Sequence, residues 1–149
     1  MPSGLGDIME AGMILLLFNN TNFANIGDAT GLRGSTVAGS FYVGLHTAAL
    51  TDVSTQVSSQ AAYGGYTRVG IARSGAGWSC VANSASNVAA ATFPTASSGS
   101  ESESYFSVGM QSGTGAGDIL YWGSLNTPLA VSVGITPSFA AGALTCSLD

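Results

Sequence analysis

Residues able to support catalysis are few in this chain of 149 residues, and they lie far apart. The only histidine, His46, follows the largely apolar run Phe41–Leu45, and no nearby serine lies in a Gly-x-Ser-x-Gly elbow. A nucleophilic site requires a base beside its nucleophile. We therefore expect His46 to be a structural residue near a strand end, hydrogen-bonded to backbone. We predict no catalytic residues and no enzyme activity.

The carboxylates indicate two possible sites, both weakly. Glu101 and Glu103 lie two residues apart in a serine-rich segment, on one side of the chain if it is extended. Calcium requires more oxygen ligands than these two supply, so we expect a solvated loop tip. Asp118 lies shortly before two aromatic residues in sequence, Tyr121 and Trp122. A carbohydrate-binding or hydrolase role there is an alternative to placing those rings in the core.

Metal and cofactor sites are not expected. One histidine and two distant cysteines, Cys80 and Cys146, cannot supply a zinc site. The glycine-rich run 113–117 lacks dinucleotide-binding spacing, and a Walker loop needs a lysine, which this chain lacks entirely. Both cysteines lie in strand-like runs and are expected to be free thiols, made in a reducing cytoplasm. A bridge between them is left open, because it depends on geometry.

The chain carries very little charge. Only 7% of its residues are charged, the net charge is −5, and Arg33, Arg68 and Arg73 are the only cations. Three scattered arginines are too few for binding nucleic acid or an anionic membrane surface. Low surface charge favours a protein whose surface is covered by neighbouring subunits. Alternatively, serine, threonine, asparagine and glycine supply the surface polarity.

The apolar pattern predicts a helix over residues 3–18, with Ser3 as N-cap. This helix either covers a sheet of its own domain or docks on a partner. Its apolar run, residues 13–18, is too short to span a bilayer, and acidic residues precede it where a signal peptide would be positive. The predicted apolar stripe of the helix consists of Leu5, Ile8, Met9, Gly12, Met13 and Leu16.

A loop over residues 22–39 and a body over residues 40–149 complete a predicted single domain, 1–149. Eight short strands separated by glycine-rich turns indicate an all-β fold, a jelly roll or antiparallel β-sandwich of about eight strands with an N-terminal helix. The predicted strands are 41–47, 66–73, 78–82, 87–93, 104–110, 119–125, 129–133 and 143–148. Alternation in 66–73 places Arg68 on the polar face, opposite Val69 and Ile71.

Several segments together resemble a family of small tailed-phage virion proteins. The segments are Phe41-Tyr-Val-Gly-Leu-His-Thr-Ala48, Ala62-Tyr-Gly-Gly-Tyr-Thr-Arg-Val69, Ala72-Arg-Ser-Gly-Ala-Gly-Trp78, Asn83–Pro94 and Gly134–Thr145. The resemblance covers nearly all of residues 3–148 except the loop 22–39. Relatives are labelled capsid cement (decoration) proteins or tail-fibre proteins.

The resemblance implies a jelly-roll-like domain on the outer capsid surface of the virion, where it clamps adjacent subunits of the major capsid protein. We expect a homo-oligomer, dimer or trimer, that stabilises the shell. A tail or tail-fibre protein involved in host attachment is the alternative. Arg68 and Arg73 would pair with capsid carboxylates if they lie together on the polar face; otherwise their contacts are internal or with solvent.

Overall fold

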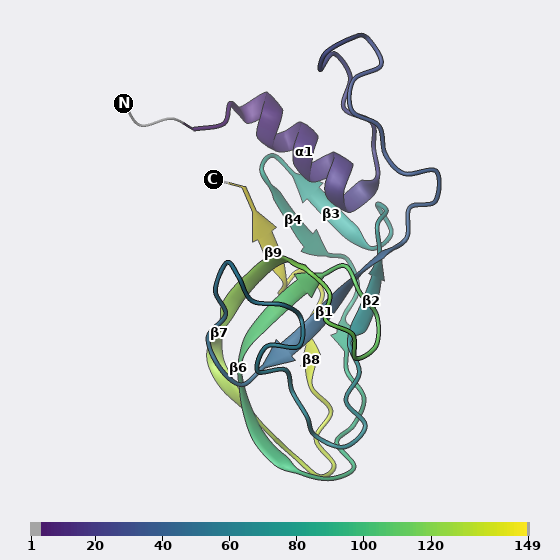
Figure 1. Cartoon of the computed structure of the whole chain (residues 1–149). Coiled ribbons are helices and arrows are strands. Elements are labelled where there is room, and N and C mark those ends of the chain that lie inside the picture. Colours follow the sequence, from purple (N-terminus) through teal and green to yellow (C-terminus); the bar gives the residue numbers. More distant parts are fainter. Residues whose placement is uncertain (1–3, 149) are drawn as a thin grey trace. The chain divides into compact units, whose positions relative to one another are not determined.

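The computed structural model describes residues 4–148, which form one helix and nine strands. The strands form sheets of four, three and two strands with antiparallel pairing. The predicted all-β antiparallel class with an N-terminal helix is therefore confirmed (Figure 1). No helix within residues 4–148 is long and apolar enough to cross a membrane.

The chain divides into two compact units. Of the described residues, unit 1 comprises 4–40, 72–90 and 140–148, and unit 2 comprises 41–71 and 91–139. The single domain 1–149 with a body over 40–149 remains a prediction. Segments far apart in the sequence fall in the same unit. The reason is that the helix needs a sheet to cover its apolar side, and that sheet is built from segments late in the sequence.

Unit 1 packs α1 (Asp7–Asn19) against a small sheet of β3 (Trp78–Val81), β4 (Ser84–Asn87) and β9 (Thr145–Ser147), in the order β3-β4-β9. Figure 1 shows α1 lying along β3 and β4. The Phe18 ring meets the Trp78 ring edge-on, with centroids 4.7 Å apart. The prediction that the helix covers a sheet of its own chain is thus confirmed for its buried face.

The helix departs from prediction at its start and in its buried side. It begins at Asp7 with Gly6 as N-cap, and the predicted N-cap, Ser3, lies outside the described residues. Ile14 and Phe18 are buried, whereas Ile8 of the predicted stripe is 80% exposed. The sequence could not show this, because α1 has apolar residues on every side and no single stripe stands out. At the other end Asn20 ends the helix in a left-handed conformation, φ 55°.

Arg73 connects the end of α1 to the segment that precedes strand β1 (Ser40–His46). Its Nε donates to the carbonyl oxygen of Leu17 at 2.7 Å, and its Nη2 donates to that of Leu16 at 3.1 Å. Its Nη1 donates to the carbonyl oxygen of Ala38 at 3.0 Å. A cation at these unpaired helix carbonyls also opposes the negative end of the helix dipole.

The three-stranded sheet explains the state of the two cysteines. In its register Cys80 lies opposite Ala85, and Ala85 lies opposite Cys146, so a whole strand separates the two thiols. Both are free, as expected, and burial raises the pKa of each, to about 12 for Cys146. Residues 84–86, which fall between the predicted strands 78–82 and 87–93, belong to strand β4. The buried Asn87 side chain donates to two carbonyl oxygens and accepts from the Leu144 amide.

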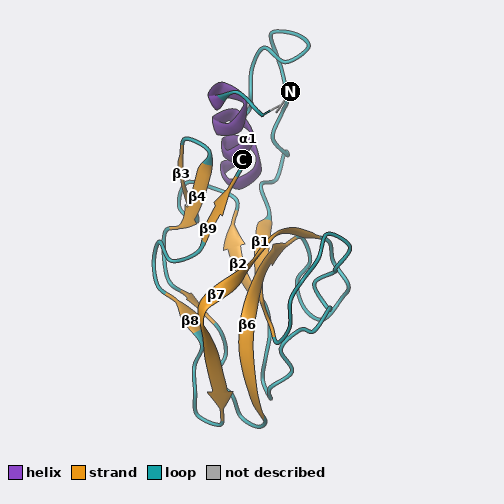
Figure 2. Cartoon of the chain, turned by 90° about the vertical axis from the view of Figure 1, so that its left-hand side faces the viewer, coloured by secondary structure: helices purple, strands orange, loops and turns teal. Residues whose placement is uncertain are grey.

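Unit 2 contains most of a four-stranded sheet in the order β2-β1-β6-β7, with β1 Ser40–His46, β2 Val69–Ala72, β6 Ser100–Gly109 and β7 Ile119–Ser132. A two-stranded sheet joins β5 (Ala91–Thr92) to β8 (Ser138–Phe139). The long strands β6 and β7 run side by side in Figure 2. The two strands predicted at 119–125 and 129–133 are one strand, β7, with a bulge between Ser124 and Leu129.

Candidate functional site

The side chains that could do chemistry gather inside unit 2, on and beside β1 and β6. His46 and Ser107 are both completely buried, with 0% exposure. The Nδ1 of His46 lies 2.8 Å from the carbonyl oxygen of Ser58, and its Nε2 lies 2.8 Å from Ser107 Oγ. Because a carbonyl only accepts, Nδ1 carries the proton and Nε2 accepts from the serine hydroxyl.

Ser107 Oγ and His46 Nε2 are as close as a nucleophile and its base, but both side chains are enclosed, which indicates a structural hydrogen bond. Burial lowers the pKa of His46, so the ring is held neutral. A fully enclosed hydroxyl offers no surface to a substrate. The predicted backbone hydrogen bond of His46 is confirmed, whereas Ser107 was missed because a lone serine in a strand carries no signal in sequence.

Gly44 allows the side chains of His46, Ser107 and Tyr66 to pack closely together, and we call these three side chains the polar cluster. A Cβ atom at position 44 would lie 3.1 Å from Ser107 Oγ, 3.3 Å from His46 Nε2 and 3.4 Å from the Tyr66 hydroxyl. Tyr66 itself accepts a hydrogen bond from the Leu45 amide at 2.9 Å. The glycine inside β1 is thus explained by the close approach of polar side chains.

Replacing Gly44 with alanine should destabilise the protein by about 1–3 kcal/mol, because the added methyl group forces the His46 and Ser107 side chains apart. Urea denaturation measures the change. Gly75→Ala is the matched control, since its new methyl group would have nothing within 4 Å. Equal stability losses in the two variants would show that the cluster does not require the glycine.

Glu103 contradicts the predicted loop tip. Strand β6 begins at Ser100, and Glu103 is 0% exposed, with neither carboxylate oxygen hydrogen-bonded within the described structure. Burial, followed by the nearby carboxyl of Glu101, raises its pKa to about 8. Glu101 instead accepts from the backbone amides of Ala62 and Tyr63, at 2.8 and 2.7 Å. The serine-rich composition suggested a turn, but alternation on an extended strand directs Glu103 inward.

The glycine-rich loop before β7 is held by internal contacts. Arg68 is 6% exposed and donates to the carbonyl oxygens of Gln111 and Gly115, at 3.1 and 2.9 Å. The buried Gln56 accepts from the Gln111 amide at 2.8 Å. A Cβ atom on Gly117 would lie 2.3 Å from the Gln56 side chain. Glycine is therefore required there by packing.

The predicted polar-face position of Arg68 is wrong, because its side chain is buried. Arg68 belongs to unit 2 and binds its own loop, whereas Arg73 belongs to unit 1 and binds its own helix. Both arginines thus serve internal contacts, which was the other alternative. Guanidinium groups can satisfy several carbonyl oxygens at once, which explains their place inside a chain with so few charges.

The remaining predicted candidates do not form a site. Asp118 is exposed and forms an isolated bridge with Thr55, while Trp122 is 43% exposed on β7. Within residues 4–148 no hydrogen bond joins their side chains. Across the same range, no three histidine, cysteine, aspartate or glutamate side chains gather to hold a metal ion.

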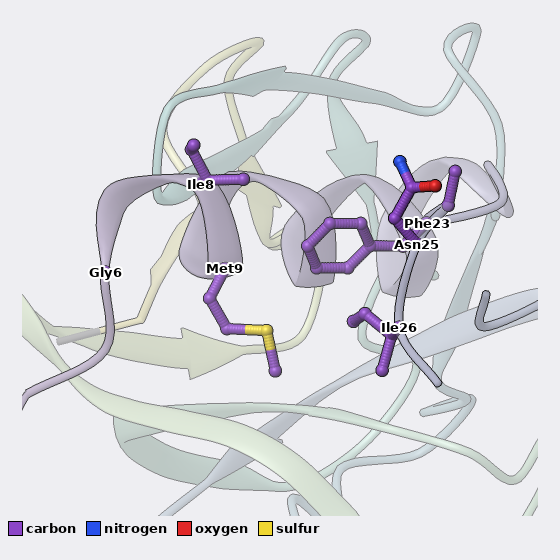
Figure 3. Close-up of a pocket in the computed structure, with 7 residues that line it drawn as sticks. Gly6, Ile8, Met9, Phe23, Asn25 and Ile26 are labelled. Carbon is purple, nitrogen blue, oxygen red and sulfur yellow. The ribbon is translucent and has the colours of Figure 1, made fainter. Parts of the chain in front are cut away.

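A pocket of about 620 Å³ lies in unit 1 between the start of α1 and the loop that follows it. The side chains of Met9 and Ile26 lie near the Phe23 ring (Figure 3). Gly12 lets that ring approach the helix, since a Cβ there would lie 2.3 Å from it. The lining is mainly apolar, so the pocket suits an apolar group rather than a charged one.

Large apolar side chains are exposed in both units. Ile8, Val37 and Val81 are 80%, 80% and 71% exposed in unit 1, and Val53 and Val133 are 90% and 66% exposed in unit 2. A free monomer normally offsets such side chains with surrounding charge, which this chain lacks. These apolar side chains, unlike the buried polar groups of unit 2, lie at the surface of the described structure.

Comparison with known proteins gives one family. A family model described as "Podophage GP4 fiber I protein gp80" matches residues 9–147, which is nearly the whole chain and includes segments of both units. A search of curated proteins gives no match.

Proposed function

The chain belongs to the podophage fibre I protein family, a family of phage structural proteins, and from that premise we propose that it is a non-enzymatic structural subunit of a phage fibre. The single observation that carries this proposal is the family match over residues 9–147. The match spans the described helix almost completely and all nine strands, so the shared feature is the whole fold rather than one motif.

The geometry supports a role in packing rather than in chemistry. His46, Ser107 and Glu103 are all enclosed in the interior of unit 2. What remains outside is weakly charged and partly apolar. Burying such a surface against other subunits costs little desolvation of charge and removes apolar area from water.

The proposed partners are other virion proteins and further copies of this chain. Nucleic acid and membranes do not fit, because two of the three arginines, Arg68 and Arg73, are engaged in internal contacts. One remaining arginine, Arg33, cannot provide the repeated phosphate contacts that such binding needs. No cofactor is required for a role of this kind.

A capsid cement protein on the outer capsid surface, contacting the major capsid protein, is the second candidate. It is favoured by the exposed apolar side chains, which occur in each of the two units. A cement subunit contacts several neighbours, and repeated modest contacts add through avidity.

Copy number distinguishes the two candidates. Quantitative mass spectrometry of purified particles would compare this chain with the major capsid protein. A fibre subunit should be present at a small fraction of the capsid protein, and a cement subunit at a comparable amount. A chain that is missing from purified particles would contradict both.

A further inference from the structure

Residues 61–66 of unit 2, which we call the strap, lie against the side of β6 that carries Glu101 and Glu103. These two residues lie in a part of β6 with regular pairing to β7, so their side chains point to the same side of the strand. Glu101 accepts from the amides of Ala62 and Tyr63 in the strap. Burial, and then the charges of neighbouring groups that include both carboxyls, raise the pKa of Tyr63 to about 12. The strap is therefore in contact with one carboxyl and close to the other.

The strap is held less firmly than the strand that it covers. Within the described residues it belongs to no strand. Its backbone bonds to neighbouring segments join Ala61 to Leu45 and Gly64 to Ser97 and Ser98, each at 2.9 Å. Strand β6 instead pairs with β7 and, along its second half, with β1 as well. Local opening takes place where few backbone hydrogen bonds hold a segment, which favours movement of the strap over movement of β6.

Glu103 is a source of free energy for such an opening. Its side chain is 0% exposed, and neither carboxylate oxygen has a hydrogen-bond partner in the described structure. An ionised carboxylate in this position would lack both water and a partner. Burial and then Glu101 therefore raise the pKa of Glu103 to about 8, whereas a carboxyl that water reaches returns toward its ordinary value of 4.5.

The ionisable groups around Glu103 do not neutralise its charge. Glu101, on the same strand, adds a second negative charge. Tyr63 and Tyr66 of the strap stay neutral, because burial above all raises the pKa of each to about 12. Beyond the strap, Arg68 donates to carbonyl oxygens of the loop before β7, and His46 is held neutral by burial. The segment 93–98, which the strap also contacts, contains no ionisable residue.

We propose that the strap is a pH-dependent latch, which is closed over a protonated Glu103 and opens when this carboxyl gives up its proton to water. The closed form keeps the proton and the open form releases it, so rising pH favours the open form. The equilibrium constant for opening should increase about tenfold per pH unit between about pH 5 and pH 8 and then level off. This property does not depend on the proposed role in the virion.

Hydrogen exchange of the full chain tests the latch through the Ala62 and Tyr63 amides. Intrinsic amide exchange increases about tenfold per pH unit, so an opening equilibrium that also increases tenfold should make these two amides exchange about a hundredfold faster per pH unit between pH 5 and pH 7.5. They should also exchange faster than the amides of β1 and be insensitive to low urea, as in a local opening. An increase of only tenfold per pH unit overturns the proposal. So do the same rates and urea dependence as β1, because the strap would then open only with global unfolding.

Glu103→Gln is the matching variant, because glutamine has a similar shape and cannot ionise. Exchange of the Ala62 and Tyr63 amides in this variant should increase only about tenfold per pH unit, the intrinsic dependence. The Gly34 amide in unit 1, which donates to Asn22, is the internal control and should show this tenfold dependence in both proteins. A variant whose strap amides keep the hundredfold dependence overturns the proposal. The wild-type measurement stands without the variant, and neither bears on the copy number in particles that tests the proposed function.

Discussion

The native protein should become less stable as the pH rises toward 8, and replacing Glu103 with glutamine should abolish this loss of stability. The pKa of Glu103 is raised from 4.5 to about 8 in the folded state, first by burial and then by Glu101. Between these values the folded protein keeps a proton that the unfolded chain releases. The free energy of unfolding therefore falls with rising pH, by at most about 1.4 kcal/mol per pH unit, and levels off above pH 8.

The measurement is the difference in unfolding free energy between Glu103→Gln and the native protein, from urea titrations at several pH values between 5 and 9. Because both proteins retain His46, its opposite contribution below its usual pKa of 6.5 cancels in the difference. The difference should favour the variant increasingly up to pH 8. Glu10→Gln, the same change on α1, should show no such trend. A constant difference for Glu103→Gln would mean that Glu103 is ionised in the folded protein.

Replacing Trp78 with alanine should cost about 3–5 kcal/mol, the range for truncating a buried large aromatic residue. Trp78 is 0% exposed and holds α1 on β3 through the Phe18 ring. The loss leaves a cavity between the helix and the sheet of unit 1. Urea denaturation, followed by circular dichroism, measures the change in stability.

Trp122→Ala provides the comparison, because the same side chain is removed from a position that is 43% exposed. At dilutions where the chain is monomeric, we expect a loss of about 1 kcal/mol for Trp122→Ala. Similar losses at the two positions would contradict the role of Trp78 as the main contact between α1 and its sheet.

The antiparallel β class could be predicted because its signal is local. Alternating apolar residues and glycine-rich turns predict β1 and β3 to within a residue or so at each end, as the strands 40–46 and 78–81 show. The division into two units could not be predicted in this way. It depends on β9 (Thr145–Ser147) pairing with β4, a contact between segments about sixty residues apart that no local pattern encodes.

The buried polar cluster was partly visible in the sequence. His46 at a strand end indicated a structural hydrogen bond to backbone, whereas Ser107 and the need for glycine at position 44 were found only in the structure. Glu103 was misplaced because composition favoured a turn, whereas pairing with β7 keeps residues 100–109 extended. In such cases the tertiary environment overrides local propensity.

The predicted lack of charge at the surface is what links sequence to function most directly. Arg68 and Arg73 are internal, which leaves even less free charge than the composition suggests. Membership of a phage structural family supports the inference that neighbours cover this surface, and it shifts the expected position from the capsid shell toward a fibre.

Oxidative footprinting of purified particles tests most directly whether neighbouring subunits cover this protein. Trp122 and Met110 are 43% and 51% exposed in the single chain, and both side chains react readily with hydroxyl radicals. In particles, Trp122 should be protected relative to the free chain, and unfolding the particles should restore its reactivity. If Trp122 and Met110 are each oxidised to the same extent in particles as in the free chain, the result contradicts the claim that neighbouring subunits cover this protein.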